Sequence, residues 1–178
     1  YEGATPFTND LFSMKYQIFR PYDTKRTEFK LKESIGNVTV YKNTDKTALA
    51  YAMDDMVKTW DYQDYNPFYV QNDLATSAFD VDELFHMIET EKPKLNNCKI
   101  TSDNGDGEYV FENTSAQPDN MVFTIKSSKA RQLYVHFDGS QVENTVIEKN
   151  GEQILTGRLD SQIIYLGNVQ KGDVIRIK

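Results

Sequence analysis

Residues 48–79, ALAYAMDDMVKTWDYQDYNPFYVQNDLATSAF, contain the signals that organise the first half of the chain. The apolar run at residues 48–53 is typical of a short buried strand, and it is followed by the only tryptophan, Trp60. Asn66 and Pro67 then predict a helix start, because an asparagine side chain can accept an N–H from the first turn and proline needs no N–H there. The stretch therefore predicts a strand, an aromatic junction and a helix.

Apolar spacing predicts two consecutive helices after Trp60. Val70, Leu74 and Ala78 recur on one side of the first helix and are its expected core face. Asp80 with Glu83 resembles the capping box of a second helix. The apolar stripe of that second helix consists of Val81, Leu84, Phe85 and Ile88.

The residues before this stretch read as one helical turn and several strands. Thr8 is the expected cap of a short helix near the N-terminus. Alternation then predicts strands at residues 15–20, 27–32 and 38–41, the last two separated by a turn at Gly36.

From residue 95 onward, short strands alternate with tight turns. The expected strands cover residues 99–102, 108–113, 121–125, 133–137, 145–148, 153–156, 163–166 and 174–177. Asn150-Gly151 is a strong hairpin signal, because both central residues of a type I′ turn need positive φ. The pattern predicts a mainly β (α+β) fold, an antiparallel β-sandwich of jelly-roll-like topology with two short helices inserted in the first half.

Length and composition favour one folded domain over residues 1–178, with a subdivision near Pro93 as the alternative. The formal charge of -7, without a stripe of lysine or arginine, excludes nucleic acid as an expected partner.

Cys98 has no second cysteine with which to form a disulfide or a zinc site. No stretch approaches the roughly 20 apolar residues of a membrane span. Because the chain starts at Tyr1 without a signal-peptide pattern and stops at Lys178 in a predicted strand, we expect a piece of a longer protein.

Aromatic, acidic and amide side chains around Trp60 suggest a sugar-binding surface, because aromatic faces stack on sugar rings while carboxylates and amides pair with hydroxyls. The candidate glycan-binding residues are Trp60, Asp61, Tyr62, Asn66, Gln71 and Asn72. The structural alternative is that Trp60 closes one end of the core, which is the commoner role of a large aromatic residue.

Other polar groups have simpler structural interpretations. Asp54-Asp55 and the acidic group at residues 80–83 resemble carboxylate pairs, but negative charge also stabilises a helix N-terminus. His86 and His136 stand alone, without a second ligand at metal spacing. We expect no resident metal. Oxygen-rich residues in a predicted turn are a weak calcium candidate: Asp103, Asp106 and Glu108.

Three segments resemble the YfhO family of bacterial multi-pass membrane proteins, found mainly in Firmicutes. They are residues 8–19 (TNDLFSMKYQIF), 38–53 (VTVYKNTDKTALAYAM) and 60–74 (WDYQDYNPFYVQNDL). The string Asn66-Pro67-Phe68 with Gln71-Asn72 is the most specific. The chain departs from the family where Ala50 follows Leu49 in place of the usual proline.

The resemblance implies sugar transfer from a polyprenyl-phosphate donor to an extracellular acceptor such as lipoteichoic acid. The family's catalytic acids belong to loops between membrane helices, so the resemblance implies no catalytic residue and no cofactor in this chain. It implies instead an extracytoplasmic domain at the cell membrane, whose partners are the protein's own transmembrane region and a cell-envelope glycan. The motif at residues 60–72 then either contacts glycan or sets the fold.

Two other functions remain open from the residues alone. A hydrolase would use Asp54, Asp61 or Asp82, and would need a pocket holding one carboxylate of perturbed pKa. A stand-alone carbohydrate-binding or protein-interaction module would expose an aromatic or apolar patch.

Overall fold

The fold is described from a computed structural model of the 178-residue chain. It describes residues 3–21, 27–45, 50–61, 66–88, 90–103, 109–116, 120–137, 144–159 and 161–178.

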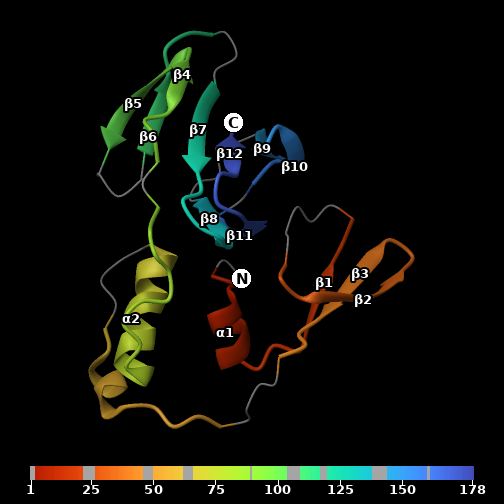
Figure 1. Cartoon of the computed structure of the whole chain (residues 1–178), viewed down its shortest axis with the longest axis vertical. Helices are drawn as coiled ribbons and strands as arrows, with labels where there is room; N and C mark the ends of the chain where they lie inside the picture. Colours follow the sequence, from red (N-terminus) through yellow and green to blue (C-terminus); the bar gives the residue numbers. More distant parts are fainter. Residues whose placement is uncertain are drawn as a thin grey trace. The chain divides into compact units, whose positions relative to one another are not determined.

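Within these ranges the chain forms two α-helices, one 3-10 helix and antiparallel strands. Figure 1 labels the α-helices and the strands. The helices are α1 (Pro6–Leu11), η1 (Asp55–Thr59) and α2 (Pro67–Phe79). The strands are β1 (Tyr16–Phe19), β2 (Lys30–Ile35), β3 (Val38–Lys42), β4 (Lys94–Asn96), β5 (Cys98–Asp103), β6 (Tyr109–Asn113), β7 (Asn120–Lys126), β8 (Arg131–Phe137), β9 (Thr145–Lys149), β10 (Glu152–Gly157), β11 (Gln162–Val169) and β12 (Val174–Ile177). The predicted class, mainly β with antiparallel sheets and two short helices in the first half, is confirmed.

The chain divides into two compact units, each assembled from separate parts of the sequence. Unit 1 comprises Tyr1–Met87, Tyr134–Asp138 and Ser161–Tyr165, and unit 2 comprises Ile88–Leu133, Gly139–Asp160 and Leu166–Lys178. Strands β8 and β11, which pair with each other, each contribute residues to both units. Whether residues 1–178 fold as one domain stays a prediction.

Helix α1 begins one turn earlier than the sequence suggested. Thr5, not Thr8, is the N-cap, and Pro6 occupies the first turn. The Thr5 N–H donates to the Thr8 hydroxyl at 3.0 Å, while Thr5 Oγ1 accepts from the Thr8 N–H at 3.4 Å. Thr8 is therefore the second half of a capping box, and predicting it as the cap was wrong.

In unit 1, β3 lies between β1 and β2 in a three-stranded antiparallel sheet. The predicted strand at residues 27–32 begins only at Lys30. The Phe29 N–H instead donates to the Thr27 hydroxyl at 3.1 Å, a local bond that competes with strand pairing. Phe29 itself is buried in the core of unit 1.

Helix α2 starts at Asn66 and Pro67 as predicted, but its buried face is rotated from the predicted one. Its buried residues are Phe68, Gln71, Ala75 and Ala78. Val70 and Leu74 are only half-buried, so of the expected core face Ala78 alone is correct. A buried glutamine replaces an apolar residue on this face because it has polar partners in unit 1.

Two predicted elements beside α2 do not form. Residues 50–53 of the expected strand lack strand pairing, and residues 48–49 lie outside the described ranges. The second helix is also absent from residues 80–88, because Asp80 adopts a left-handed conformation (φ 53°) that ends α2. Its N–H still donates to the Thr76 carbonyl at 3.1 Å, and the chain then turns away from the helix axis.

Unit 2 is built on a five-stranded sheet in the order β10-β9-β12-β7-β4, with β5 and β6 forming a separate hairpin. The predicted hairpin between β9 and β10 is confirmed, and its turn residues Asn150 and Gly151 have φ of 53° and 85°. The buried apolar side chains of this unit are Cys98, Ile125, Leu133, Ile147, Leu155, Leu159, Leu166, Val169, Ile175 and Ile177. The strands predicted at residues 121–125 and 174–177 are likewise confirmed, as β7 and β12.

Candidate functional site

Trp60 and Asp61 lie at the end of the 3-10 helix η1. Asp54 begins this helix by accepting the Met56 N–H at 2.9 Å, and its own N–H donates to the Ala78 carbonyl of α2 at 2.9 Å. Trp60 ends the helix and is half-buried. Its backbone N–H donates to the Val57 carbonyl at 3.2 Å. Asp61 is exposed. Tyr62, the third residue of the predicted aromatic surface, lies outside the described residues.

Asn66 and Gln71 are buried polar side chains of α2, only 6% and 5% exposed. Asn66 Oδ1 accepts the Phe68 N–H at 3.0 Å, which caps the helix. Gln71 Oε1 accepts the Thr5 hydroxyl, and its Nε2 donates to the Gly3 carbonyl at 3.3 Å. Gln71 thus joins α2 to the segment that leads into α1.

Asn72 holds the segment that follows α2. Its Nδ2 donates to the Phe85 carbonyl at 2.8 Å. Its Oδ1 accepts the Leu84 N–H at 3.1 Å and the Phe85 N–H at 2.8 Å. The Phe85 ring then lies 5.2 Å from the Phe68 ring and 5.9 Å from the Tyr134 ring. The segment at residues 80–88 is held by these bonds and does not form the predicted helix.

The three amides of the motif at residues 66–72 therefore share one local role. Asn66 caps α2, Gln71 contacts residues 3–5 and Asn72 contacts residues 84–85. Asn66 bonds to its own helix and the other two amides bond to other segments of unit 1, which gives a physical reason for the motif as a fold-setting element. Glycan contact by these residues, and by Trp60 and Asp61, stays a prediction.

The carboxylates weighed as catalytic pairs lie at the surface with local contacts. Asp55 pairs with Lys58 at 2.6 Å, with both side chains largely exposed. Glu83 lies 3.1 Å from Nδ1 of the exposed His86. Asp82 is exposed, while His136 is half-buried on β8.

For the calcium candidate, only Asp103 can be placed: it is exposed at the end of β5. Asp106 and Glu108 lie outside the described residues. Within the described ranges, no group of three or more His, Cys, Asp or Glu side chains is arranged to hold a metal ion.

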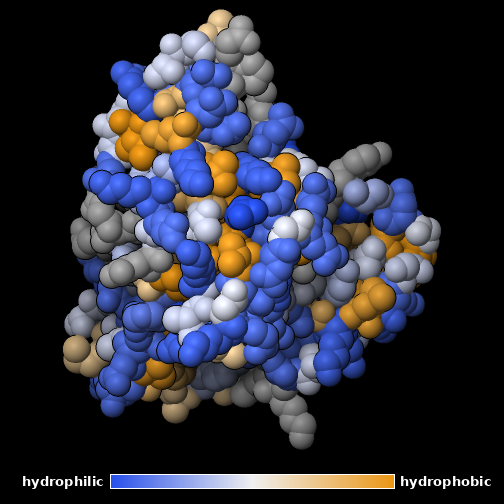
Figure 2. Space-filling view, turned by 45° about the horizontal axis from the view of Figure 1, so that its top comes forward, coloured by the Kyte–Doolittle hydropathy of each residue, from blue (hydrophilic) through white to orange (hydrophobic). Residues whose placement is uncertain are grey.

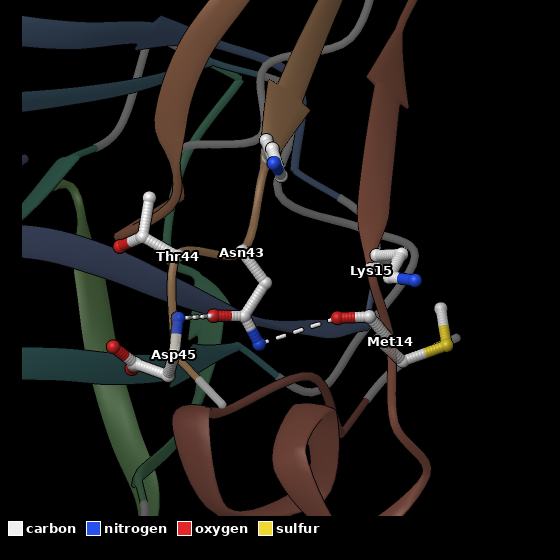
Figure 3. A pocket seen from close by; sticks show the side chains of 6 residues that line it. Met14, Lys15, Asn43, Thr44 and Asp45 are labelled. Atoms are coloured by element: carbon white, nitrogen blue, oxygen red, sulfur yellow. Dashed lines mark hydrogen bonds between the residues drawn. The ribbon is translucent and has the colours of Figure 1, made fainter. Parts of the chain in front are cut away.

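Two small hollows lined by described residues stand apart from the predicted site residues. One, of about 300 Å³, lies beside Met14, Lys15, Lys42, Asn43, Thr44 and Asp45 (Figure 3). Buried Asn43 supports its wall: Nδ2 donates to Asp10 Oδ1 at 2.9 Å and to the Met14 carbonyl at 3.2 Å, and Oδ1 accepts the Asp45 N–H at 2.9 Å. The other, of about 360 Å³, lies beside Asn150, Gly151, Val174 and Arg176. Both are open to solvent and have linings of mixed polarity, unlike the enclosed, mostly apolar pockets that bind small molecules.

Glu28 is a polar residue of unit 1 that sequence reasoning missed. Burial raises the pKa of its carboxyl above the usual range, and the charges of Asp10 and Asp45 act in the same direction. Its Oε1 accepts Asn9 Nδ2 at 2.9 Å, which opposes that shift. Burial, followed by the charge of Glu28, also raises the pKa of the Tyr134 hydroxyl. No local sequence pattern indicates the contact between Asn9 and Glu28, because the two residues lie on separate segments.

Comparison with known proteins adds one positive finding. Neither the curated proteins nor the solved structures include a match to this chain. The helices in the described ranges are all too short or too polar to cross a membrane. A family model described as bacterial membrane protein YfhO matches residues 1–178. The match extends beyond the three motifs through the β-rich second half, and the chain therefore belongs to the YfhO family of bacterial membrane proteins.

Proposed function

We propose that this chain is a non-catalytic extracytoplasmic domain of a membrane protein that transfers sugar from a polyprenyl-phosphate donor to a cell-envelope glycopolymer such as lipoteichoic acid. The domain helps to position the acceptor glycan for the membrane-embedded core. The observation that carries the proposal is the family match over the whole chain.

The contacts of the acidic residues support a role outside the chemical step. A glycosidase-type reaction needs two carboxyls facing each other across a substrate cleft. Here Asp54 caps η1, Asp55 pairs with exposed Lys58, and Glu83 lies beside His86. These local roles favour positioning over hydrolysis for the described carboxylates.

Among the candidate residues that the structure describes, Trp60 and Asp61 are the two that we propose contact glycan. Trp60 is half-buried and keeps part of its surface accessible, while Asp61 is exposed beside it. The amides of Asn66, Gln71 and Asn72 hold the fold of unit 1. A shallow aromatic site of this kind binds sugar weakly, with Kd on the order of 1 mM.

Calorimetric titration with short glycerol-phosphate oligomers and with their glycosylated forms tests this site. We expect Trp60→Ala to abolish binding, because stacking on the sugar ring is lost. Asp61→Asn should weaken binding severalfold, because pairing of the carboxylate with sugar hydroxyls is lost. Trp60 is the only tryptophan, so its fluorescence should shift on titration of the unsubstituted chain.

Phe111→Ala is the matched control, since Phe111 is an exposed aromatic residue on β6. It should bind like the unsubstituted chain. Unchanged affinity in a folded Trp60→Ala variant would exclude Trp60 from the site. Turnover of a glycan by the purified chain would contradict the non-catalytic role.

A further inference from the structure

In the three-stranded sheet of unit 1, one face packs inward along β1 and the other lies open, while β2 is exposed along its whole length, including Leu31 on the inward face. On the inward face, Gln17 Nε2 donates to Asn9 Oδ1 of α1 at 3.4 Å, and the rings of Phe19 and Tyr41 lie 5.3 Å apart. Opposed residues of antiparallel strands share a face, and successive residues alternate between faces. The register therefore places Ile18, which follows Gln17, on the open face, called the hairpin face below.

The end of the hairpin face nearest the β2–β3 turn is aliphatic. Ile18 pairs with Val40, and Ile35 pairs with Val38 directly across the turn. Ile18 and Ile35 are 63% and 64% exposed. Gly36 has a φ of 60°, and a Cβ at this position would meet nothing within 4 Å, so the hairpin tip projects into open space. Hydrophobic groups stand out at the right-hand edge of Figure 2, on the side where Figure 1 draws β2 and β3.

The other end of the hairpin face is basic and aromatic. Lys42 pairs with Tyr16 on one side and with Lys30 on the other, so the three residues form a row across the strands. A β-bulge brings Lys32 to the same end, where its Nζ lies 5.0 Å from the centre of the Tyr16 ring. Glu33 is the acidic residue of this face: it pairs with Val40, in the row of Ile18, and its Oε1 lies 3.5 Å from Lys32 Nζ. Three lysines against one glutamate make the face positive, although the whole chain carries -7.

We propose that the hairpin face binds an anionic lipid surface. An aliphatic tip followed by a belt of lysine and tyrosine is the order in which side chains enter a bilayer: apolar groups reach the acyl chains while cationic and aromatic groups stay at the headgroups. The positive charge complements anionic lipid phosphates. Membership of a family of bacterial membrane proteins supports a lipid partner.

Flotation of the 178-residue chain with lipid vesicles tests the inference. The chain should float with vesicles of phosphatidylcholine mixed with phosphatidylglycerol, and much less with phosphatidylcholine alone. Added salt should weaken the binding, because it screens exposed charges.

Two double variants separate the contributions to binding. Lys30→Gln with Lys42→Gln should weaken vesicle binding about thirtyfold, since each lysine near an anionic surface contributes about fivefold. Ile18→Ser with Ile35→Ser should weaken it about tenfold or more, through lost apolar burial. Val110→Ser, an exposed β-branched position on β6, and Lys171→Gln, an exposed charge, are the matched controls and should bind as before.

Circular dichroism establishes that each variant is folded. Failure of the unsubstituted chain to float with anionic vesicles would overturn the inference. So would vesicle binding by both double variants that is as strong as that of the unsubstituted chain, which would place the lipid contact elsewhere. Concentration-dependent dimers that the Ile18→Ser, Ile35→Ser variant abolishes would assign the hairpin face to a second copy of the chain, and would overturn the lipid assignment. None of these outcomes depends on whether Trp60 binds glycan.

Discussion

Asn72 uses both ends of one amide to hold a segment without regular secondary structure. It makes three hydrogen bonds to Leu84 and Phe85, and so fixes the Phe85 ring against Phe68. Asn72→Ala should lower the free energy of unfolding by about 2 kcal/mol, because partly buried backbone groups lose their partner. Urea denaturation followed by circular dichroism measures this change.

The neighbouring exposed residue supplies the control for Asn72. Asp73 lies on the solvent side of α2, so Asp73→Ala should leave the free energy of unfolding nearly unchanged. Asn72→Asp keeps the acceptor but removes the donor to the Phe85 carbonyl, and should fall between the two. If Asn72→Ala were as stable as Asp73→Ala, the segment at residues 84–85 would be held by ring packing alone.

The β9–β10 hairpin and the β11–β12 turn are joined by polar bonds around Asp173. Asn150 Nδ2 donates to Asp173 Oδ1 at 2.9 Å, and the Gln170 N–H donates to Asp173 Oδ2 at 2.9 Å. Lys149 Nζ lies 3.0 Å from Asp173 Oδ2. The bond from Asn150, followed by those from Gln170 and Lys149, lowers the pKa of Asp173 to about 2.

This depressed pKa predicts how acid affects the connection between the two turns. A carboxylate with a lowered folded pKa stabilises the fold above its ordinary pKa of 3.8, and this stabilisation is lost as pH falls toward 2. Asp173→Asn should therefore lower the melting temperature above pH 4, and the difference from the unsubstituted chain should shrink toward pH 2. Thermal melts across this range measure the difference.

Glu152→Gln is the matched control for the acid effect, because Glu152 is an exposed carboxylate of the same hairpin. Its melting temperature should follow that of the unsubstituted chain at every pH. A difference between Asp173→Asn and the unsubstituted chain that stays constant from neutral pH to pH 2 would show that the Asp173 charge does not act through its bonds.

Seen as a whole, the chain belongs to a membrane protein family, and its proposed extracytoplasmic position can be tested in the full-length parent protein. Lys129 is exposed between β7 and β8, so Lys129→Cys offers a labelling site. Cys98 is buried, and its Sγ lies 3.2 Å from the Asn120 carbonyl. A maleimide reagent that cannot cross membranes should label Lys129→Cys in intact cells as fully as in lysed cells.

The unsubstituted parent protein is the control for this labelling, because it reports every other cysteine. Labelling of Lys129→Cys only after lysis would place the domain on the cytoplasmic side. That result would contradict the proposed access to an extracellular glycan, while leaving family membership intact.

Local signals in the sequence were sufficient for much of the fold. Asn66-Pro67 starts α2 and Asn150-Gly151 forms the β9–β10 turn, because each depends on one or two residues whose own geometry decides the outcome. Short apolar runs bounded by turn residues likewise located β7 and β12.

Predictions failed where distant partners competed with a local pattern. Residues 80–88 have an apolar stripe suited to a helix, yet Asp80 ends α2 and Asn72 bonds to residues 84–85. The buried face of α2 includes Gln71 because Thr5 and Gly3, distant in sequence, satisfy its amide. The raised pKa of Glu28 also depends on burial that no neighbouring residue signals.

The sequence by itself determined the family, the mainly β class and the main turns, since these depend on motifs and on periodicity along the chain. Only the tertiary structure decided that the amides of residues 66–72 bond within unit 1, and that Ile18 and Ile35 lie exposed on one face with Lys30 and Lys42. The physical reason is that a side chain's hydrogen-bond partners and its exposure depend on segments brought together in space. Spacing along one segment cannot specify them.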